Sequence, residues 1–167
     1  QHHRTRSETE MTSAFARPLV AHIIDRLPPD GAERLLIDVL KNRSDRFNYV
    51  VLCLVEGGVL AEALETMGIP VIIFGRTSAF DIALLCRLAR WLRQHHVVVV
   101  HTHLFTADSW GRVAALMARV QGIFSTIHSV NSWKGNRHRL VDRILAFLST
   151  RVIACSEQVA DELRRRD

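Results

Sequence analysis

Two kinds of hydrophobic pattern alternate along the chain. Short runs rich in β-branched residues predict strands, and longer segments with apolar residues every three or four positions predict amphipathic helices. The predicted strands are Leu19–Ile24, Tyr49–Val55, Val71–Phe74, Val97–His101, Ile123–Ile127 and Val152–Ala154. This alternation is typical of a parallel sheet covered by helices on both faces. The sequence therefore predicts an α/β, Rossmann-like domain with a mostly parallel sheet of about six strands.

Two of the helical segments carry apolar stripes that we expect to face the sheet. The first stripe is Leu35, Leu36, Val39 and Leu40, and the second is Leu84, Leu85, Leu88, Trp91 and Leu92. Further helices are predicted over about 108–119 and 137–148. A last helix should begin at Ser156, because a serine hydroxyl is a good N-terminal cap.

Length and composition favour a single domain. The chain has 167 residues, of which 48% are hydrophobic. Residues 1–16 are polar and patternless, so we expect a disordered or tag-like extension before a domain at 17–167. No apolar run approaches the ~20 residues of a membrane-spanning helix, and no secretory signal is visible, which predicts a cytoplasmic protein. The three cysteines are expected to be reduced and buried.

The charge balance is basic, with a formal net charge of +5 and a pI near 9.8. Such a balance suits an anionic partner, either a phosphorylated ligand or a membrane surface. A nucleic acid is not expected, because the few aromatic residues show no interleaving with basic ones.

In an open parallel sheet, ligands bind beyond the carboxyl ends of the strands. The first such turn contains Pro28-Pro29-Asp30-Gly31 and leads directly into a helix. It lacks the three spaced glycines of a dinucleotide fingerprint. Free N–H groups at a helix N-terminus would still favour a phosphate. A non-catalytic module that binds a phosphoryl ligand therefore remains an alternative interpretation.

His101 and His103 alternate near the end of a predicted strand, so both side chains should lie on one face of the sheet. This spacing also suits a metal-dependent hydrolase that would use the two histidines and Asp108. A His-x-His-x-Asp-His motif, however, would need Asp and His where Phe105 and Thr106 stand. We therefore expect no metal site.

Several segments appear in the order known from one enzyme family. They are Gly31-Ala32-Glu33-Arg34 before an apolar helix, VVVVHTH at 97–103, STIH at 125–128, and VIACSE at 152–157 followed by Val159 to Leu163. Together they resemble the N-terminal, acceptor-side half of the retaining glycosyltransferases of family 4, which have the GT-B fold. The resemblance covers about residues 18–166.

The resemblance implies transfer of a sugar from a nucleotide donor, with retention at the anomeric carbon, to a saccharide or lipid-linked acceptor in surface polysaccharide or glycolipid synthesis.

No cofactor is implied, because the nucleotide sugar is a substrate held mainly by a C-terminal half that is not in this sequence. His128 is implied as the catalytic residue. Substrate contacts are expected from Gly31, Ala32, Glu33, His103, Asp108 and Ser156. Asp30 departs from the family's usual glycine, and its charge would repel a diphosphate.

A basic segment follows His128 in the sequence. Trp133, Lys134, Arg137 and Arg139 combine an aromatic side chain with three cations. Cations and an indole ring suit the headgroup region of an anionic membrane. We therefore expect this segment to contact a lipid surface or a phosphorylated acceptor, as in a peripheral membrane enzyme.

Overall fold

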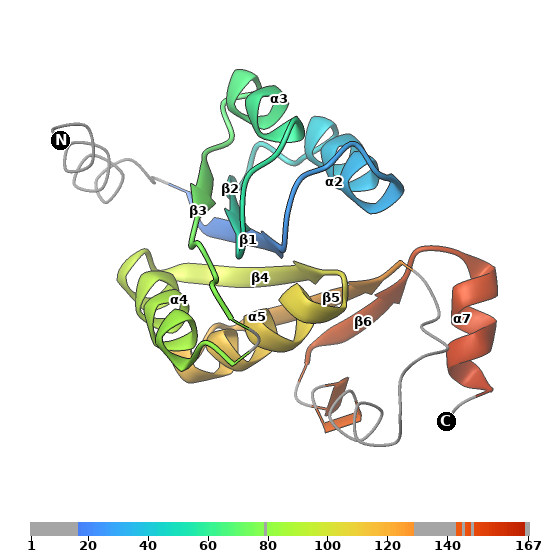
Figure 1. Ribbon diagram of the computed structural model, residues 1–167. Helices are drawn as coiled ribbons and strands as arrows, with labels where there is room; N and C mark the ends of the chain where they lie inside the picture. Colours follow the sequence, from blue (N-terminus) through green and yellow to red (C-terminus); the bar gives the residue numbers. More distant parts are fainter. Residues whose placement is uncertain (1–16, 79, 129–142, 145, 148, 166–167) are drawn as a thin grey trace, which may run out of the picture.

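The computed structural model describes residues 17–78, 80–128, 143–144, 146–147 and 149–165. The strands in this part of the chain are β1 (Leu19–Ile24), β2 (Asn48–Cys53), β3 (Val71–Ile73), β4 (Val97–His103), β5 (Gly122–Ile127) and β6 (Arg151–Ala154). The helices are α2 (Gly31–Lys41), α3 (Leu60–Thr66), α4 (Ile82–Gln94), α5 (Phe105–Ala118) and α7 (Glu157–Arg164) (Figure 1).

The strands form one sheet in the order β3-β2-β1-β4-β5-β6, and every neighbouring pair is parallel. The predicted fold class is confirmed. This is the doubly wound strand order, in which the chain reverses direction between β1 and β4. Ligands of such sheets bind at that switch point, at the carboxyl edge of the strands.

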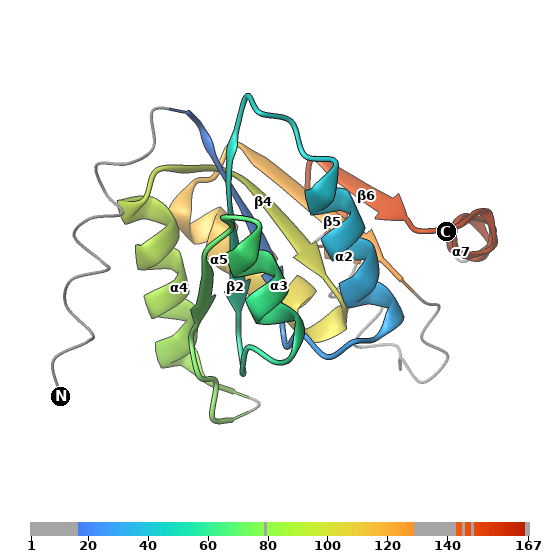
Figure 2. The same ribbon diagram turned by 90° about the horizontal axis from the view of Figure 1, so that it is seen from above.

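Two helical layers cover the sheet, with α2 and α3 on one face and α4 and α5 on the other (Figures 1 and 2). Side chains of β1 alternate between the two layers, because successive residues of a strand point to opposite faces. Ile23 packs in the core under α4 and α5, and Ile24 packs in the core under α2 and α3.

Helix α2 is rotated relative to its predicted orientation. Leu36 and Leu40 are buried as expected, but Leu35 is 40% exposed and Val39 is 47% exposed. The buried stripe is instead Glu33, Leu36, Ile37 and Leu40. Those positions have the i, i+3, i+4, i+7 spacing of a helix face. The prediction was wrong here because it counted only apolar residues and left Glu33 out of the buried stripe.

Helix α4 agrees better with its apolar pattern. Leu84, Leu88 and Leu92 are buried, and Leu85 and Trp91 pack at the edge of the same core. The Asp81 carboxylate caps the helix by accepting a hydrogen bond from the Leu84 N–H at 2.8 Å.

The expectation of three buried cysteines was wrong for two of them. All three are free, but only Cys53 is buried, and both Cys86 and Cys155 are exposed. Cys86 lies on the outer side of α4, and Cys155 follows the edge strand β6, so neither is covered by a second layer.

Some predictions concern residues outside the described part of the chain. They include the extension at 1–16, most of the helix at 137–148, and Trp133, Lys134, Arg137 and Arg139. Among the described residues, no helix combines the length and apolarity needed to cross a bilayer.

Candidate functional site

The carboxyl ends of all six strands lie at one edge of the sheet, because the strands are parallel. Helices α2, α5 and α7 begin at this edge, which is on the right in Figure 1. The predicted site residues at the start of α2, at the end of β4, after β5 and before α7 therefore all lie at this carboxyl edge of the sheet.

The sharpest turn at this edge follows β4. The strand continues to His103, two residues beyond its predicted end, and α5 already begins at Phe105. Only Leu104 separates them, with φ 66° and ψ 159°. A side chain in this region is strained, and such strain is often found at functional sites.

Behind this turn, three histidines form a buried cluster. His22 of β1 lies beside His101 and His103 of β4, on the face that α2 and α3 cover. The His22 Nδ1 is 3.0 Å from the His103 Nε2, and the His101 Nε2 is 2.7 Å from the Thr126 hydroxyl. His22 and His103 are each 3% exposed.

His128 joins this cluster to the edge of the sheet. It follows β5 directly, is half-buried, and places its Nε2 3.4 Å from the His103 Nδ1. The Cys155 thiol donates to the His128 carbonyl oxygen at 3.3 Å, so β6 helps to hold the backbone at this point.

Burial keeps all four rings neutral. It lowers the pKa of His22 to about 3, with a smaller contribution from His101, and the pKa of His101 to about 4, with a smaller contribution from His128. The pKa of His103 is well below its usual value because of burial and then because of His22, His101 and His128. Burial also lowers the pKa of His128. Neutral imidazoles can donate at one nitrogen and accept at the other.

His22 was not among the predicted site residues, because it lies inside the apolar run LVAHII. A polar residue inside a fully buried strand needs a partner, because an unpaired buried polar group is costly. That requirement was the available signal. Only the pairing of β1 with β4 shows that the partner is His103.

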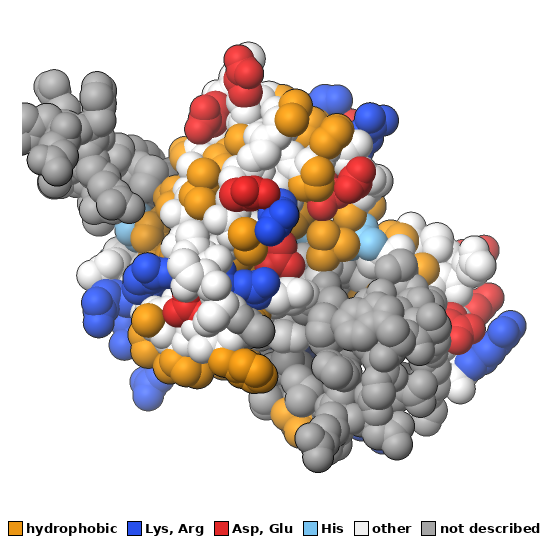
Figure 3. All heavy atoms as spheres, viewed as in Figure 1, with side chains coloured by type: hydrophobic (Ala, Val, Ile, Leu, Met, Phe, Trp, Pro, Cys, Tyr) orange, Lys and Arg blue, Asp and Glu red, His pale blue; other side chains and the backbone are white. Residues whose placement is uncertain are grey.

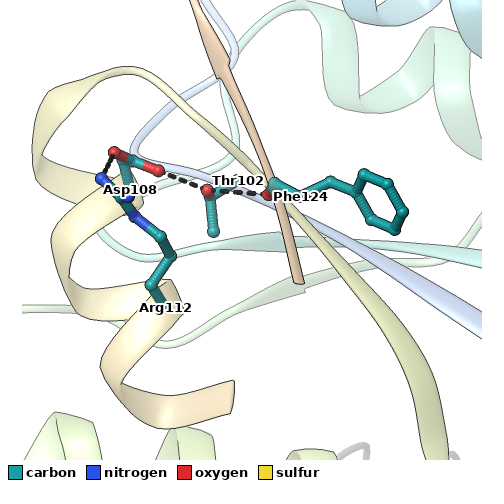
Figure 4. A network of polar contacts seen from close by, with 4 residues as sticks. All are labelled: Thr102, Asp108, Arg112 and Phe124. Atoms are coloured by element: carbon teal, nitrogen blue, oxygen red, sulfur yellow. Dashed lines mark hydrogen bonds and ion pairs between the residues drawn. The ribbon is translucent and has the colours of Figure 1, made fainter. Parts of the chain in front are cut away.

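Asp108 lies on the opposite face of β4, in the network shown in Figure 4. Its carboxylate forms an ion pair with Arg112, one turn later in α5, and accepts from the Thr102 hydroxyl at 2.5 Å. The Thr102 hydroxyl also lies 3.2 Å from the Phe124 carbonyl oxygen. The predicted substrate residue Asp108 is therefore buried and engaged between α5, β4 and β5.

Gly111 makes this close packing of α5 possible. A Cβ at Gly111 would lie 2.5 Å from the Thr102 Cγ2 and 3.1 Å from the Ile23 Cδ1, so no larger residue fits without a shift. The glycine lets α5 approach β1 and β4 closely.

The start of α2 combines exposed backbone with a buried carboxyl group. Gly31 is exposed, Ala32 is half-buried and Glu33 is buried. Burial raises the pKa of Glu33, and the charge of Asp30 raises it further, against a backbone hydrogen bond that lowers it. Asp30 occupies the N-cap position, but its side chain makes no capping hydrogen bond.

A second carboxylate lies where β1 ends. Asp25 Oδ1 is 3.9 Å from Arg76 Nη1, and neither of these two buried atoms has a hydrogen-bond partner. Burial raises the pKa of Asp25, whereas Arg76, the Thr106 hydroxyl and the Ala107 N–H act in the opposite direction. This pair was not predicted, because Arg76 is distant from Asp25 in sequence.

Ser156 has the predicted capping role at the start of α7. Its hydroxyl accepts from the Val159 N–H at 3.3 Å. The residue is exposed, so the same hydroxyl remains accessible at the edge of the sheet.

The histidine cluster is also the one group of metal-ligating type found among the described residues. Its three ligand nitrogens, from His22, His101 and His103, lie within 4.8 Å of one another. The group includes no carboxylate, and one nitrogen of each ring already contacts another ring or Thr126. This arrangement satisfies the rings without an ion, although neutral imidazoles are also competent ligands.

In Figure 3, charged and apolar side chains are interspersed over the upper part of the surface, and apolar side chains gather along the lower edge of the view below α4. Phe80 precedes α4 and is 88% exposed, and Ile82, which begins α4, is exposed as well.

A cavity of about 400 Å³ lies at the amino ends of the strands, lined by Arg17, Arg43, Tyr49 and Pro70 among others. Because both arginines donate to backbone carbonyls and the cavity lies opposite the switch point, we do not assign the site there.

Solved structures share this fold. HepE from Anabaena, in complex with UDP and glucose, matches with a TM-score of 0.69 and 22% identity over 84% of this chain and 39% of that chain. A glycosyltransferase from Rickettsia africae matches with a TM-score of 0.66 and 17% identity over 89% of this chain and 39% of that one. A putative UDP-N-acetylglucosamine 2-epimerase from Listeria monocytogenes matches with 0.61 and 14%, over 90% of this chain and 43% of that one.

The chain thus spans about two fifths of the length of these solved relatives. Comparison with curated protein sequences gives no significant match. The model of Glycosyltransferase Family 4 matches residues 29–167, which include the start of α2, the histidines of β4, His128 and Ser156. This Rossmann-like domain therefore belongs to glycosyltransferase family 4 and has the fold of the N-terminal part of GT-B enzymes.

Proposed function

We propose that this chain is the acceptor-side domain of a retaining glycosyltransferase, which moves a sugar from a nucleotide donor to a saccharide or lipid-linked acceptor. Surface polysaccharide or glycolipid synthesis is the proposed setting. The observation that carries the proposal is His128, a half-buried neutral imidazole at the carboxyl edge of β5, in a domain of glycosyltransferase family 4.

His128 is the proposed catalytic residue. A neutral ring can donate to a sugar oxygen or accept from a sugar hydroxyl without ionising, and so can orient the reacting groups. The pKa of His128, lowered by burial, supports this role because a neutral ring persists at pH 7.

Substrate contacts are proposed from the start of α2 and from Ser156. The N–H groups of Gly31, Ala32 and Glu33, at the N-terminus of α2, would attract a phosphate. Asp30 weakens this attraction, so a single phosphate or a sugar hydroxyl suits the turn better than a diphosphate.

The roles proposed for His103 and Asp108 are indirect. His103 is covered by other rings and Asp108 by Arg112. Both are therefore proposed to hold neighbouring site residues in place without contacting the substrate. The nucleotide of the donor is assigned to a second Rossmann-like half, since relatives with UDP in their structures are more than twice as long as this chain.

The proposal is tested by comparing this chain with a form that carries a nucleotide-sugar-binding half. The chain alone should transfer no sugar, and the longer form should transfer it. In the longer form, His128→Ala should lower kcat/KM by about 10²-fold, as loss of a positioned polar group does. The melting temperature should change little.

His96→Asn is a matched control, because His96 is exposed, lies before the amino end of β4, and has a φ of 51° that asparagine tolerates. Normal turnover in His128→Ala would overturn the proposal. Binding of a phosphorylated ligand by the longer form without turnover would favour the alternative, a non-catalytic binding module.

We also propose that Trp133, Lys134, Arg137 and Arg139 contact an anionic membrane surface or a phosphorylated acceptor. Each cation near such a surface gains about 1 kcal/mol, and salt screens the attraction. The chain should therefore co-sediment with anionic vesicles at low salt, but not with neutral ones. Equal recovery with both kinds of vesicle, or unchanged recovery when the three cations are replaced by Glu, would contradict it.

A further inference from the structure

Three histidines form a hydrogen-bonded chain from the middle of the sheet to its carboxyl edge. The chain runs from His22 of β1 through His103 of β4 to His128 after β5, with nitrogen–nitrogen distances of 3.0 Å and 3.4 Å. His103 uses both ring nitrogens, Nε2 toward His22 and Nδ1 toward His128. Only His128 is open to the edge of the sheet, because the other two rings are each 3% exposed.

A neutral imidazole carries one N–H, so it donates at one nitrogen and accepts at the other. The two contacts of His103 must therefore have the same direction. Either His22 donates to His103 and His103 donates to His128, or both hydrogen bonds are reversed. The first arrangement places the remaining hydrogen of His128 on Nδ1, and the second leaves Nδ1 as an acceptor.

We propose that His22 and His103 are positioning residues, which hold the ring of His128 and couple its tautomer to their own. The coupling lets the second ring nitrogen of His128, Nδ1, serve as donor or acceptor without a change in net charge. Its importance for sugar transfer rests on the proposed function, but the coupling itself does not.

Burial supports this assignment over direct contact with a substrate. Two covered rings cannot contact a ligand, yet a polar group in a dry site needs a partner. The surroundings also favour neutral rings, because a proton on His103 would face His22, His101 and His128 together.

His101 provides a matched control inside the same cluster. It lies on the same strand and the same face, and its ring centroid is 4.4 Å from that of His103. Its Nε2, however, contacts the Thr126 hydroxyl and not the chain of rings. A substitution there disturbs the cluster but leaves both hydrogen bonds of His103 in place.

The first measurement uses the wild-type chain with ¹⁵N-labelled histidine. Nuclear magnetic resonance should show couplings across the hydrogen bonds from His103 to both His22 and His128, and the ring shifts should report the tautomer of each. Absence of both couplings would overturn the proposal without any variant.

The second measurement follows the tautomer ratio of His128 in variants. In His22→Phe the ratio should change about threefold to tenfold, the range expected for loss of one ordinary hydrogen bond, although His22 does not contact His128. The control His101→Asn should leave the ratio unchanged. An unchanged ratio in His22→Phe would overturn the proposal, and His22→Gln, whose amide reaches the place of Nε2 rather than of Nδ1, replaces that variant if it does not fold.

A pair of substitutions at His103 separates the two hydrogen bonds. The amide of His103→Asn can reach the place of Nδ1 and keep the contact with His128, whereas that of His103→Gln can reach the place of Nε2 and keep the contact with His22. We expect mixed tautomers of His128 and a raised pKa in the Gln variant, with a smaller change in the Asn variant. Equal behaviour of the two variants would overturn the proposed order of the chain.

The consequence for transfer is measured separately, in a form that includes the nucleotide-sugar-binding half. His22→Phe should lower kcat while the KM for the donor changes little, because the ring it orients is not the nucleotide site. If the resonance data show the chain but His128→Ala retains turnover, the proposed function fails and the coupling stands. If turnover falls in His128→Ala but the tautomer of His128 is independent of His22, the coupling fails and the function stands.

Discussion

The two faces of β4 show two ways to bury polar groups. On the face under α5, Thr102 contacts Asp108, which forms an ion pair with Arg112. On the face under α2 and α3, His101 and His103 lie among neutral rings that include His22. The two sets come from alternating residues of one strand, so their difference comes from what packs above each face.

The network of Asp108 and Arg112 is charged, and its two charged groups pair with each other. The network of histidine rings is neutral and ends at His128, which is half-buried at the edge of the sheet. Asp108 and Arg112 satisfy each other one helical turn apart, and through Thr102 they fasten α5 to the sheet (Figure 4). The rings can exchange donor and acceptor roles, and they lead to His128 at the edge of the sheet. A closed ion pair stabilises one arrangement of elements, whereas an open chain of neutral groups can respond to a ligand.

The largest expected effect comes from breaking the closed network. Arg112→Met leaves the Asp108 carboxylate buried without its cation, since the two side chains are 3% and 9% exposed. Removal of one partner of a buried ion pair costs about 3–5 kcal/mol. Urea unfolding should show that loss in the free energy of unfolding.

Adding Asp108→Asn to Arg112→Met should recover part of the lost stability, because the unpaired charge is gone. Arg164→Met serves as a control, because the Arg164–Asp161 pair is exposed, and it should change stability by less than about 0.5 kcal/mol. A loss below about 1 kcal/mol in Arg112→Met would show that the ion pair does not hold α5 in place.

A smaller effect should appear when the neutral rings are titrated. The folded-state pKa values are about 3 for His22 and about 4 for His101, below the usual value near 6.5. The unfolded chain therefore binds protons first as the pH falls, and the folded state loses stability below pH 6.5. Each of these two histidines contributes about 1 kcal/mol of lost stability between pH 6.5 and 5.5.

Urea unfolding at several pH values measures this slope. His101→Gln cannot take up the proton, so its stability should fall less steeply over the same pH range. A wild-type stability that is constant from pH 6.5 to 5.5 would contradict the interpretation that the rings remain neutral when folded.

The smallest expected effect is that of zinc. Because the rings already satisfy one another and no carboxylate joins the group among the described residues, the purified chain should hold no stoichiometric zinc after dialysis. Added zinc should not raise its melting temperature. Near-equimolar zinc in the wild-type chain that is lost in the double variant His101→Ala and His103→Ala would contradict this prediction and show that these histidines bind a metal.

Sequence reasoning predicted the strands well because a buried parallel strand must be apolar along its length. The run VVVV at 97–100 and the alternation of His101 with His103 were visible without a structure, and the ring centroids of the two histidines are 4.4 Å apart. Helix α2 was harder to orient. Its buried Glu33 looks polar in a pattern, and only packing against the sheet shows that the carboxyl group is covered.

The roles of Asp108 and His22 could not be predicted for a related reason. The resemblance implied that Asp108 contacts substrate, but a sequence does not show that α5 begins early enough to turn its side chain toward Thr102. His22 and His103 are 81 positions apart, and their contact depends on the pairing of β1 with β4.

The sequence by itself determined the α/β class, the family and the approximate place of each strand, because these depend on local periodicity and on motifs read in order. The tertiary structure alone decided which of those residues meet. The β1–β4 register and the layer above each face set whether a side chain is paired with a charge, joined to another ring or left at the open edge. Such contacts join residues far apart in sequence, so local patterns carry no information about them.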